Sequence, residues 1–123
     1  MTEQIGNVNL GQYTLGASFY RQTYKHGGAC IYISKDIQFN TINLDQYNKE
    51  KGLEICSLKL CLLLSNFTII CIYRSPTRNF TYFLNQLESI LNKLYKTSTE
   101  LIVCGDFNVN YFNDSSRKLF LYS

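Results

Sequence analysis

The feature that most constrains this chain is a segment of helical periodicity between two β-prone runs. Over residues 80–94, apolar side chains recur at spacings of three and four, and Asn79 before them is a favourable helix N-cap. The flanking apolar runs 67–73 and 101–104 are short and rich in β-branched residues, which is typical of buried strands. We therefore predict a strand-helix-strand crossover with parallel strands, whose helix covers one face of a sheet. The run 101–104 is expected to be buried on both faces and to end at Gly105.

Turn residues divide the upstream sequence into further strands. Residues 13–20 and 29–33 flank the turn sequence 25–28, Lys-His-Gly-Gly, and are expected to form a hairpin. Residues 37–40 are a candidate short strand. The polar stretch 41–52 is expected to be an exposed loop.

The run 53–64 predicts another strand. Ser65 and Asn66 separate it from 67–73, so the two runs are expected to be adjacent and antiparallel. Strand alternation places Glu54, Cys56, Leu58 and Leu60 on one face, and Ile55, Ser57 and Lys59 on the other.

Polar residues follow the run 101–104 directly. Asp106 is placed at the C-terminal end of a strand, where ligands bind in layered α/β folds. Its carboxylate could take a proton or a hard divalent cation, and the amide of Asn108 could hold a phosphate oxygen. The alternative is an ordinary turn, because Asp and Asn after a glycine are common turn residues.

A second polar strand end occurs at Tyr73 and Arg74, just before Pro76. The phenol and the guanidinium could both contact a phosphate. The alternative is a tyrosine at the rim of the sheet beside a solvated arginine. His26 is the chain's single histidine, and its position before two glycines favours an exposed loop residue over a catalytic base.

Size and composition indicate one globular domain over residues 1–123. With 46% hydrophobic and 17% charged residues, the chain can bury a core. The net charge of +3 permits a polyanionic partner but falls short of a basic nucleic-acid patch.

The cysteines are odd in number and contain no CxxC pair, so they are expected to be small, reduced, buried core residues, with a free-thiol or metal role as the alternative. They are Cys30, Cys56, Cys61, Cys71 and Cys104. No run is long enough for a membrane span, and the start has no signal-peptide pattern. We expect an intracellular protein, nuclear or cytoplasmic, with no membrane partner.

Four segments in this order resemble the endonuclease/exonuclease/phosphatase superfamily. They are the stretch 27–33, the Ile72-Tyr73-Arg74-Ser75-Pro76 strand end, the amphipathic helix, and the stretch 101–108 with Gly-Asp-Phe-Asn. The likeness is greatest to the apurinic-endonuclease-like domain of non-LTR retrotransposon proteins, and it covers about Gly11 to Phe120.

The resemblance implies an α/β fold, part of a four-layer α/β sandwich with mixed sheets and truncated at both ends. It also implies Mg²⁺-dependent hydrolysis of a phosphodiester in DNA by an in-line water. By position, Asp106 resembles the aspartate that handles the proton of the attacking water and contacts the metal, Asn108 the asparagine that holds the phosphate, and Tyr73 the tyrosine facing it. Arg74 and Asn110 are expected to contact the substrate.

The chain also departs from the family pattern. The family has a metal-binding glutamate before the hairpin, for which Glu3 is the only candidate here, and a closing aspartate-histidine pair, whereas no histidine follows Asp106. Magnesium binding is therefore expected to be weak and activity to be impaired. The alternatives are a non-catalytic retroelement-derived fragment that folds onto a partner, and a phosphatase for small phosphoesters.

Overall fold

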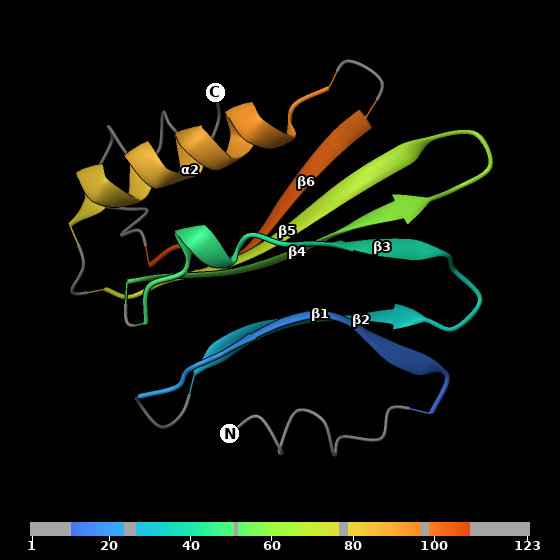
Figure 1. The fold of residues 1–123 in the computed structure, drawn as a ribbon, viewed down its shortest axis with the longest axis horizontal. Helices are drawn as coiled ribbons and strands as arrows, with labels where there is room; N and C mark the ends of the chain where they lie inside the picture. The colour runs from blue at the N-terminus through green and yellow to red at the C-terminus, as the bar shows by residue number, and fades with distance from the viewer. Residues whose placement is uncertain (1–10, 24–26, 51, 77–78, 97–98, 109–123) are drawn as a thin grey trace.

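Two β-sheets and a helix form three layers in the computed structural model, which describes residues 11–23, 27–50, 52–76, 79–96 and 99–108 (Figure 1). The upper layer is helix α2 (Phe80–Leu94), and the lower layer is the hairpin of β1 (Tyr13–Tyr20) and β2 (Gly28–Ser34). Between them lies a sheet whose strands, in spatial order, are β3 (Phe39–Ile42), β4 (Leu53–Cys61), β5 (Asn66–Arg74) and β6 (Thr99–Asp106). The described part of the chain thus has a mixed α/β fold. It contains no helix suited to spanning a membrane.

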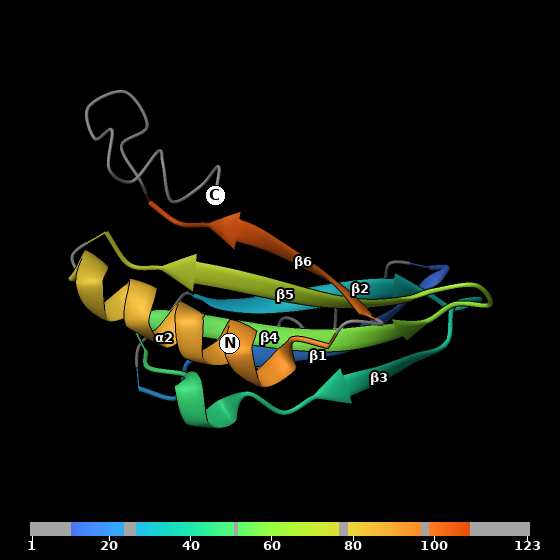
Figure 2. The same ribbon diagram turned by 90° about the horizontal axis from the view of Figure 1, so that it is seen from above.

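Three strands of the central sheet have the predicted connectivity, since β4 pairs antiparallel with β5, and β5 pairs parallel with β6. β3 pairs antiparallel with β4, a pairing that the sequence did not predict. A parallel pair needs a crossover, and α2 supplies it on one face of the sheet (Figures 1 and 2). The predictions of a first hairpin, an antiparallel pair and a parallel strand-helix-strand unit are confirmed.

Helix α2 begins and packs as its sequence predicts. The side chain of Asn79 accepts hydrogen bonds from the backbone N–H groups of Thr81 and Tyr82, which caps the helix. The buried side chains of α2 pack on apolar residues of β4, of β5 and of the loop before β4. This cluster contains Leu44, Leu53, Ile55, Ile70, Ile72, Phe83, Leu87 and Ile90. Burial of each large apolar side chain contributes about 1.5–3 kcal/mol.

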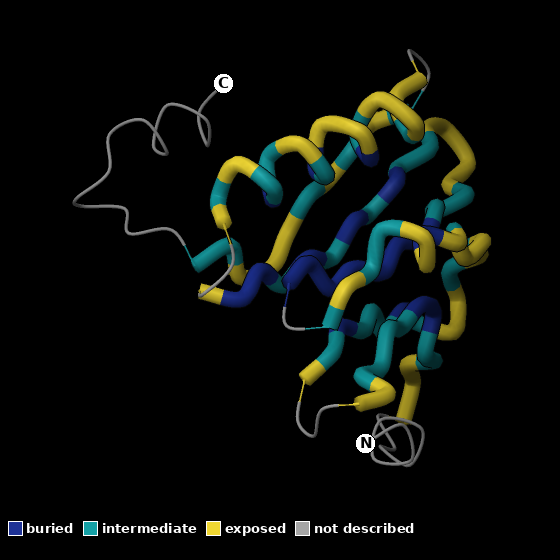
Figure 3. The backbone as a smooth tube through the Cα atoms, turned by 60° about the vertical axis from the view of Figure 1, so that its left-hand side comes forward, coloured by how far each residue is buried: buried dark blue, intermediate teal, exposed yellow. Residues whose placement is uncertain are grey.

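A second apolar cluster joins the hairpin to the opposite face of the sheet. It contains Ala17, Ala29, Ile33, Cys56 and Leu58. The β1–β2 register shifts between Leu15 and Ala17, and the Leu58 side chain occupies the space where a Cβ at Gly16 would lie. The first six residues of β4 are buried, because both of its faces are covered there, whereas in β5 buried residues alternate with half-buried ones (Figure 3).

β6 is more exposed than the sequence predicts. Ile102 is 43% exposed and Cys104 is also exposed, so burial on both faces is wrong. β6 is the edge strand among the described strands, and the hairpin packs on β3, β4 and β5 (Figure 2). The strand also continues through Gly105, whose φ of 133° suits glycine.

Other boundaries and exposures also need correction. The stretch 41–52 is not simply an exposed loop, because it holds the end of β3, the 3₁₀ helix η1 (Asp45–Tyr47) and the buried Leu44. β4 ends at Cys61, so the predicted strand to residue 64 is too long, and Leu63 is 98% exposed. Of the cysteines predicted to be buried, only Cys56 is.

Candidate functional site

Three polar side chains form a row across the central sheet. Tyr73 of β5 pairs with Glu54 of β4 in antiparallel register and with Asp106 of β6 in parallel register. Directly paired residues of neighbouring strands point to the same face of a sheet. Because Cys56 and Leu58 alternate with Glu54 and pack against the hairpin, the row lies on the hairpin face, at the C-terminal ends of β5 and β6.

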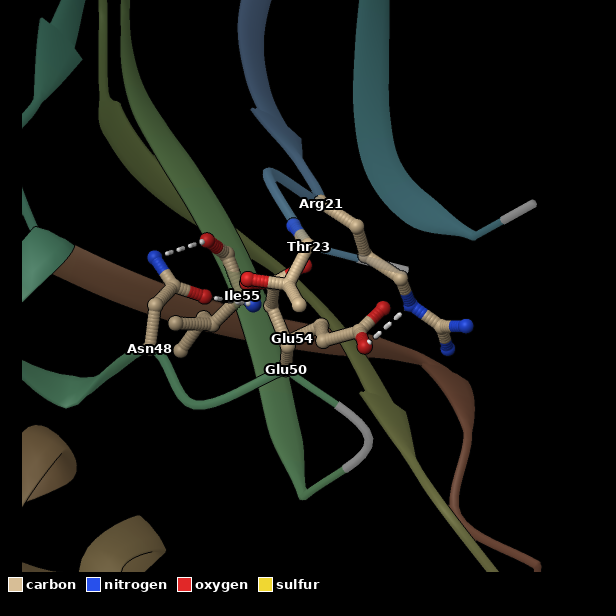
Figure 4. Close-up of polar contacts among 6 residues, drawn as sticks. All are labelled: Arg21, Thr23, Asn48, Glu50, Glu54 and Ile55. Atoms are coloured by element: carbon tan, nitrogen blue, oxygen red, sulfur yellow. Dashed lines mark hydrogen bonds and ion pairs between the residues drawn. The ribbon is translucent and has the colours of Figure 1, made fainter. Parts of the chain in front are cut away.

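A buried ion pair joins the end of the hairpin to this row. Arg21, just after β1, donates from Nε to Oε2 of Glu54 over 2.6 Å, and its guanidinium carbon lies 5.8 Å from the centroid of the Tyr73 ring. The side chains of Arg21 and Glu54 are 9% and 0% exposed. Figure 4 shows Arg21 reaching from the hairpin to Glu54 on β4. The pair therefore fixes the hairpin against this end of the sheet.

The loop before β4 is held at the same end. Asn48 exchanges two hydrogen bonds with the backbone of Ile55, at 2.6 Å and 3.1 Å, and the N–H of Thr23 donates to Oε1 of Glu50 over 2.8 Å (Figure 4). The two bonds of Asn48 take the place of strand pairing for the backbone of Ile55, since β3 pairs with β4 only from Ser57 to Leu60, and they hold the neighbouring Glu54 in position.

Asp106 and Asn108 form a turn directly after β6. The backbone N–H of Asn108 donates to Oδ1 of Asp106 over 3.0 Å, and Asn108 has a φ of 50°. Its Nδ2 donates to the carbonyl of Arg74 over 2.5 Å. The turn expected as the alternative is thus present, and it leaves the carboxylate of Asp106 exposed at the end of the row.

Arg74 lies on the other face of the sheet, because it follows Tyr73 directly in β5. It is 2% exposed, donates from Nε and Nη2 to the carbonyls of Phe107 and Asn108, and lies over the ring of Phe80. The expectation of a solvated arginine is wrong. The structure does not bring the Tyr73 and Arg74 side chains together; the contacts of Arg74 hold the residues after Asp106 in place.

The described residues do not provide a complete magnesium site. No group of three or more His, Cys, Asp or Glu side chains among them is arranged to hold a metal ion. Asp106 offers an exposed carboxylate, whereas Glu54 is bound to Arg21. Magnesium prefers near-octahedral oxygen coordination, which this pair of residues does not supply.

Sequence reasoning missed the roles of Glu54 and Arg21. The sequence did indicate that Glu54 is buried, because strand alternation places it on the same face as Cys56 in an otherwise apolar strand. Counting back from the predicted turn at 65–66 would have placed Leu58 opposite Tyr73. Glu54 lies there because the connection spans residues 62–65 and Asn66 already pairs with Cys61. Nothing in the sequence indicated the ion pair of Arg21 with Glu54, because that contact depends on how the hairpin packs on the sheet. Other predicted residues, Glu3, His26 and Asn110, lie outside the described residues.

Comparison of the chain with protein-family models, with curated proteins and with solved structures gave no match.

Proposed function

We propose that this chain is an endonuclease/exonuclease/phosphatase-type domain, part of a four-layer α/β sandwich, that contacts a phosphodiester of DNA. The observation that carries the proposal is the pairing of Tyr73 with Asp106 at the C-terminal ends of parallel strands, closed by the Asp106–Asn108 turn. Such strand ends are where α/β sheets bind ligands. The order of motifs in the sequence, given above, supports the same family.

Each residue of the site has a role that suits a phosphodiester. The exposed carboxylate of Asp106 can accept a proton from an attacking water. The phenol of Tyr73 can donate a hydrogen bond to a phosphate oxygen. The amide of Asn108 is positioned by its bond to the carbonyl of Arg74, and an amide nitrogen carries a second N–H that can serve the phosphate.

In the proposed family, magnesium supplies charge neutralisation at the phosphate. Because the described residues do not fit a complete magnesium site, we propose that the chain contacts DNA but cleaves it at a rate near background. A second candidate function is a non-catalytic module that binds a partner. The exposed apolar side chain of Ile102 on the edge strand β6 favours that candidate.

DNA binding by a conservative variant tests the proposal. A fluorescently labelled duplex with an abasic-site analogue is titrated with the chain in magnesium buffer, and binding is followed by anisotropy. Tyr73→Phe removes only the phenolic hydroxyl. We expect a loss of affinity of about 10- to 150-fold, since a hydrogen bond to a charged group contributes about 1.5–3 kcal/mol.

Tyr95→Phe is the matched control, because Tyr95 is 65% exposed at the end of α2 and outside the row. Equal affinity for the parent chain and Tyr73→Phe would contradict the proposal, as would equal losses in both variants. Release of phosphate from a small aryl phosphate, abolished by Asp106→Ala, would favour the phosphatase alternative instead.

A further inference from the structure

A row of three thiols runs parallel to the Glu54–Tyr73–Asp106 row. Cys71 of β5 pairs with Cys56 of β4 and with Cys104 of β6. Each cysteine lies two residues from a member of the polar row on the same strand, so the thiols share the hairpin face. The sequence spacing of these cysteines, at 15 and 33 residues, gives no sign of this row, because only the strand register creates it.

Cys71 is the central thiol and lies between Cys56 and Cys104 in the register of the sheet. Hydrogen bonding with the Cys56 thiol lowers the pKa of Cys71 to about 7, against the opposing effect of burial. The pKa of Cys56 is raised by its hydrogen bond to Cys71 and by burial, and the partial burial of the Cys104 thiol, on an otherwise exposed residue, raises the pKa of Cys104. The first proton to leave the row is therefore that of Cys71.

Solvent access distinguishes the two partners of Cys71. Cys56 is buried in the apolar cluster beneath the hairpin, whereas Cys71 is half-buried and Cys104 is exposed on the edge strand. Cys104 also leans toward β5, since its Sγ lies 3.6 Å from the carbonyl oxygen of Ile70. A small oxidant can therefore approach from the β6 side.

We propose that Cys71 and Cys104 are a peroxide-reactive thiol pair that closes to a disulfide between β5 and β6. Neighbouring strands lie about 4.8 Å apart, which is within the Cα separation of about 4.4–6.8 Å that disulfides span. Their pairing in direct register thus brings the two sulfurs within reach after side-chain rotation.

The reaction consumes one hydrogen peroxide. The thiolate of Cys71 attacks one peroxide oxygen, the O–O bond breaks, and Cys71 becomes a sulfenic acid as hydroxide leaves. The thiol of Cys104 then attacks the Cys71 sulfur; an S–S bond forms, the S–O bond breaks, and water leaves. The hydroxide takes up the proton that left Cys71, so two thiols lose two electrons in total and peroxide is reduced to two waters.

Peptide mapping tests the pair. The purified chain is treated with one equivalent of hydrogen peroxide, free thiols are alkylated, and the product is digested with trypsin. Cleavage after lysine and arginine puts Cys71 in peptide 60–74, Cys104 in 97–117 and Cys56 in 52–59. We expect a disulfide-linked product of 60–74 with 97–117. Because Cys61 shares a peptide with Cys71, Cys61→Ser serves as the reference chain.

Two variants of that reference chain complete the test. Cys104→Ser should stop at the sulfenic acid, which a dimedone-type probe labels on peptide 60–74. Cys71→Ser should lose both the disulfide and the label. Linkage of 52–59 to 60–74, a disulfide-linked dimer as the main product, or an unchanged yield in Cys71→Ser would each overturn the assignment.

Discussion

Replacing Arg21 by methionine should strongly destabilise the fold. The change leaves the fully buried carboxylate of Glu54 without the guanidinium that lies 2.6 Å away. Removing one partner of a buried ion pair costs about 3–5 kcal/mol, because the remaining charge stays desolvated. The net stability of a domain is typically about 5–15 kcal/mol, so this loss is a large share of it.

Equilibrium unfolding in urea, followed by far-UV circular dichroism, measures the effect. At an m-value of about 2 kcal/mol per M, the loss lowers the urea midpoint by about 1.5–2.5 M. Lys35→Met is the matched control, because Lys35 is exposed at the end of the hairpin. The free energy of unfolding of Lys35→Met should stay within about 0.5 kcal/mol of the parent value, the range of ordinary surface substitutions.

The double variant Arg21→Met/Glu54→Met separates loss of the charge pair from loss of packing. Replacing a whole buried ion pair by apolar side chains of similar volume is often neutral or stabilising, so the double variant should recover most of the midpoint. An Arg21→Met midpoint equal to that of the parent would refute the reasoning. So would a double variant whose loss is the sum of the losses of the two single variants.

Four further experiments test the helix cap, Gly105, the central thiol and the proposed lack of nicking activity. Asn79→Ala should lower the free energy of unfolding by about 1 kcal/mol, or the urea midpoint by about 0.5 M, by removing the α2 cap, whereas Asn85→Ala on the exposed face of α2 should not. Gly105→Ala should cost at least about 3 kcal/mol, because its φ of 133° is unfavourable for alanine and a Cβ would collide with the Ile72 carbonyl; a parent-like melt would contradict this. Alkylation of Cys71 by iodoacetamide should accelerate as the pH rises through about 7, since the thiolate is the nucleophile; an onset only near the ordinary thiol pKa would contradict the contacts described. Supercoiled plasmid with magnesium should be nicked only at background rate, equally by the parent and by Asp106→Ala; nicking that Asp106→Ala abolishes would show a more complete site.

Local sequence patterns predicted the elements because those patterns depend on neighbours along the chain. The spacing of apolar residues determined α2 and its buried face, and Asn79 marked its start. Alternation along β4 placed Ile55 and Cys56 on opposite faces, as the two apolar clusters show. The turn residues Ser65 and Asn66 were sufficient to predict that β4 pairs with β5, but the connection spans residues 62–65 and Asn66 belongs to β5.

Properties that depend on neighbours in space were predicted less well. The exposure of β6 follows from its edge position and from the extent of the hairpin, neither of which the run 101–104 encodes. The burial of Arg74 requires the rings of Phe80 and Phe83 and the carbonyls after β6 to meet there. The thiol row exists only in the observed register; a slip of one residue would turn Cys104 to the other face.

Chemical-shift mapping of DNA binding tests the proposed site most directly. The ¹⁵N-labelled chain is titrated with the duplex that carries an abasic-site analogue, and backbone amide shifts are assigned. The account predicts the largest changes at Tyr73, Asp106 and Asn108. Changes confined to the basic end of α2, around Lys93 and Lys96, with none at these three residues, would contradict it.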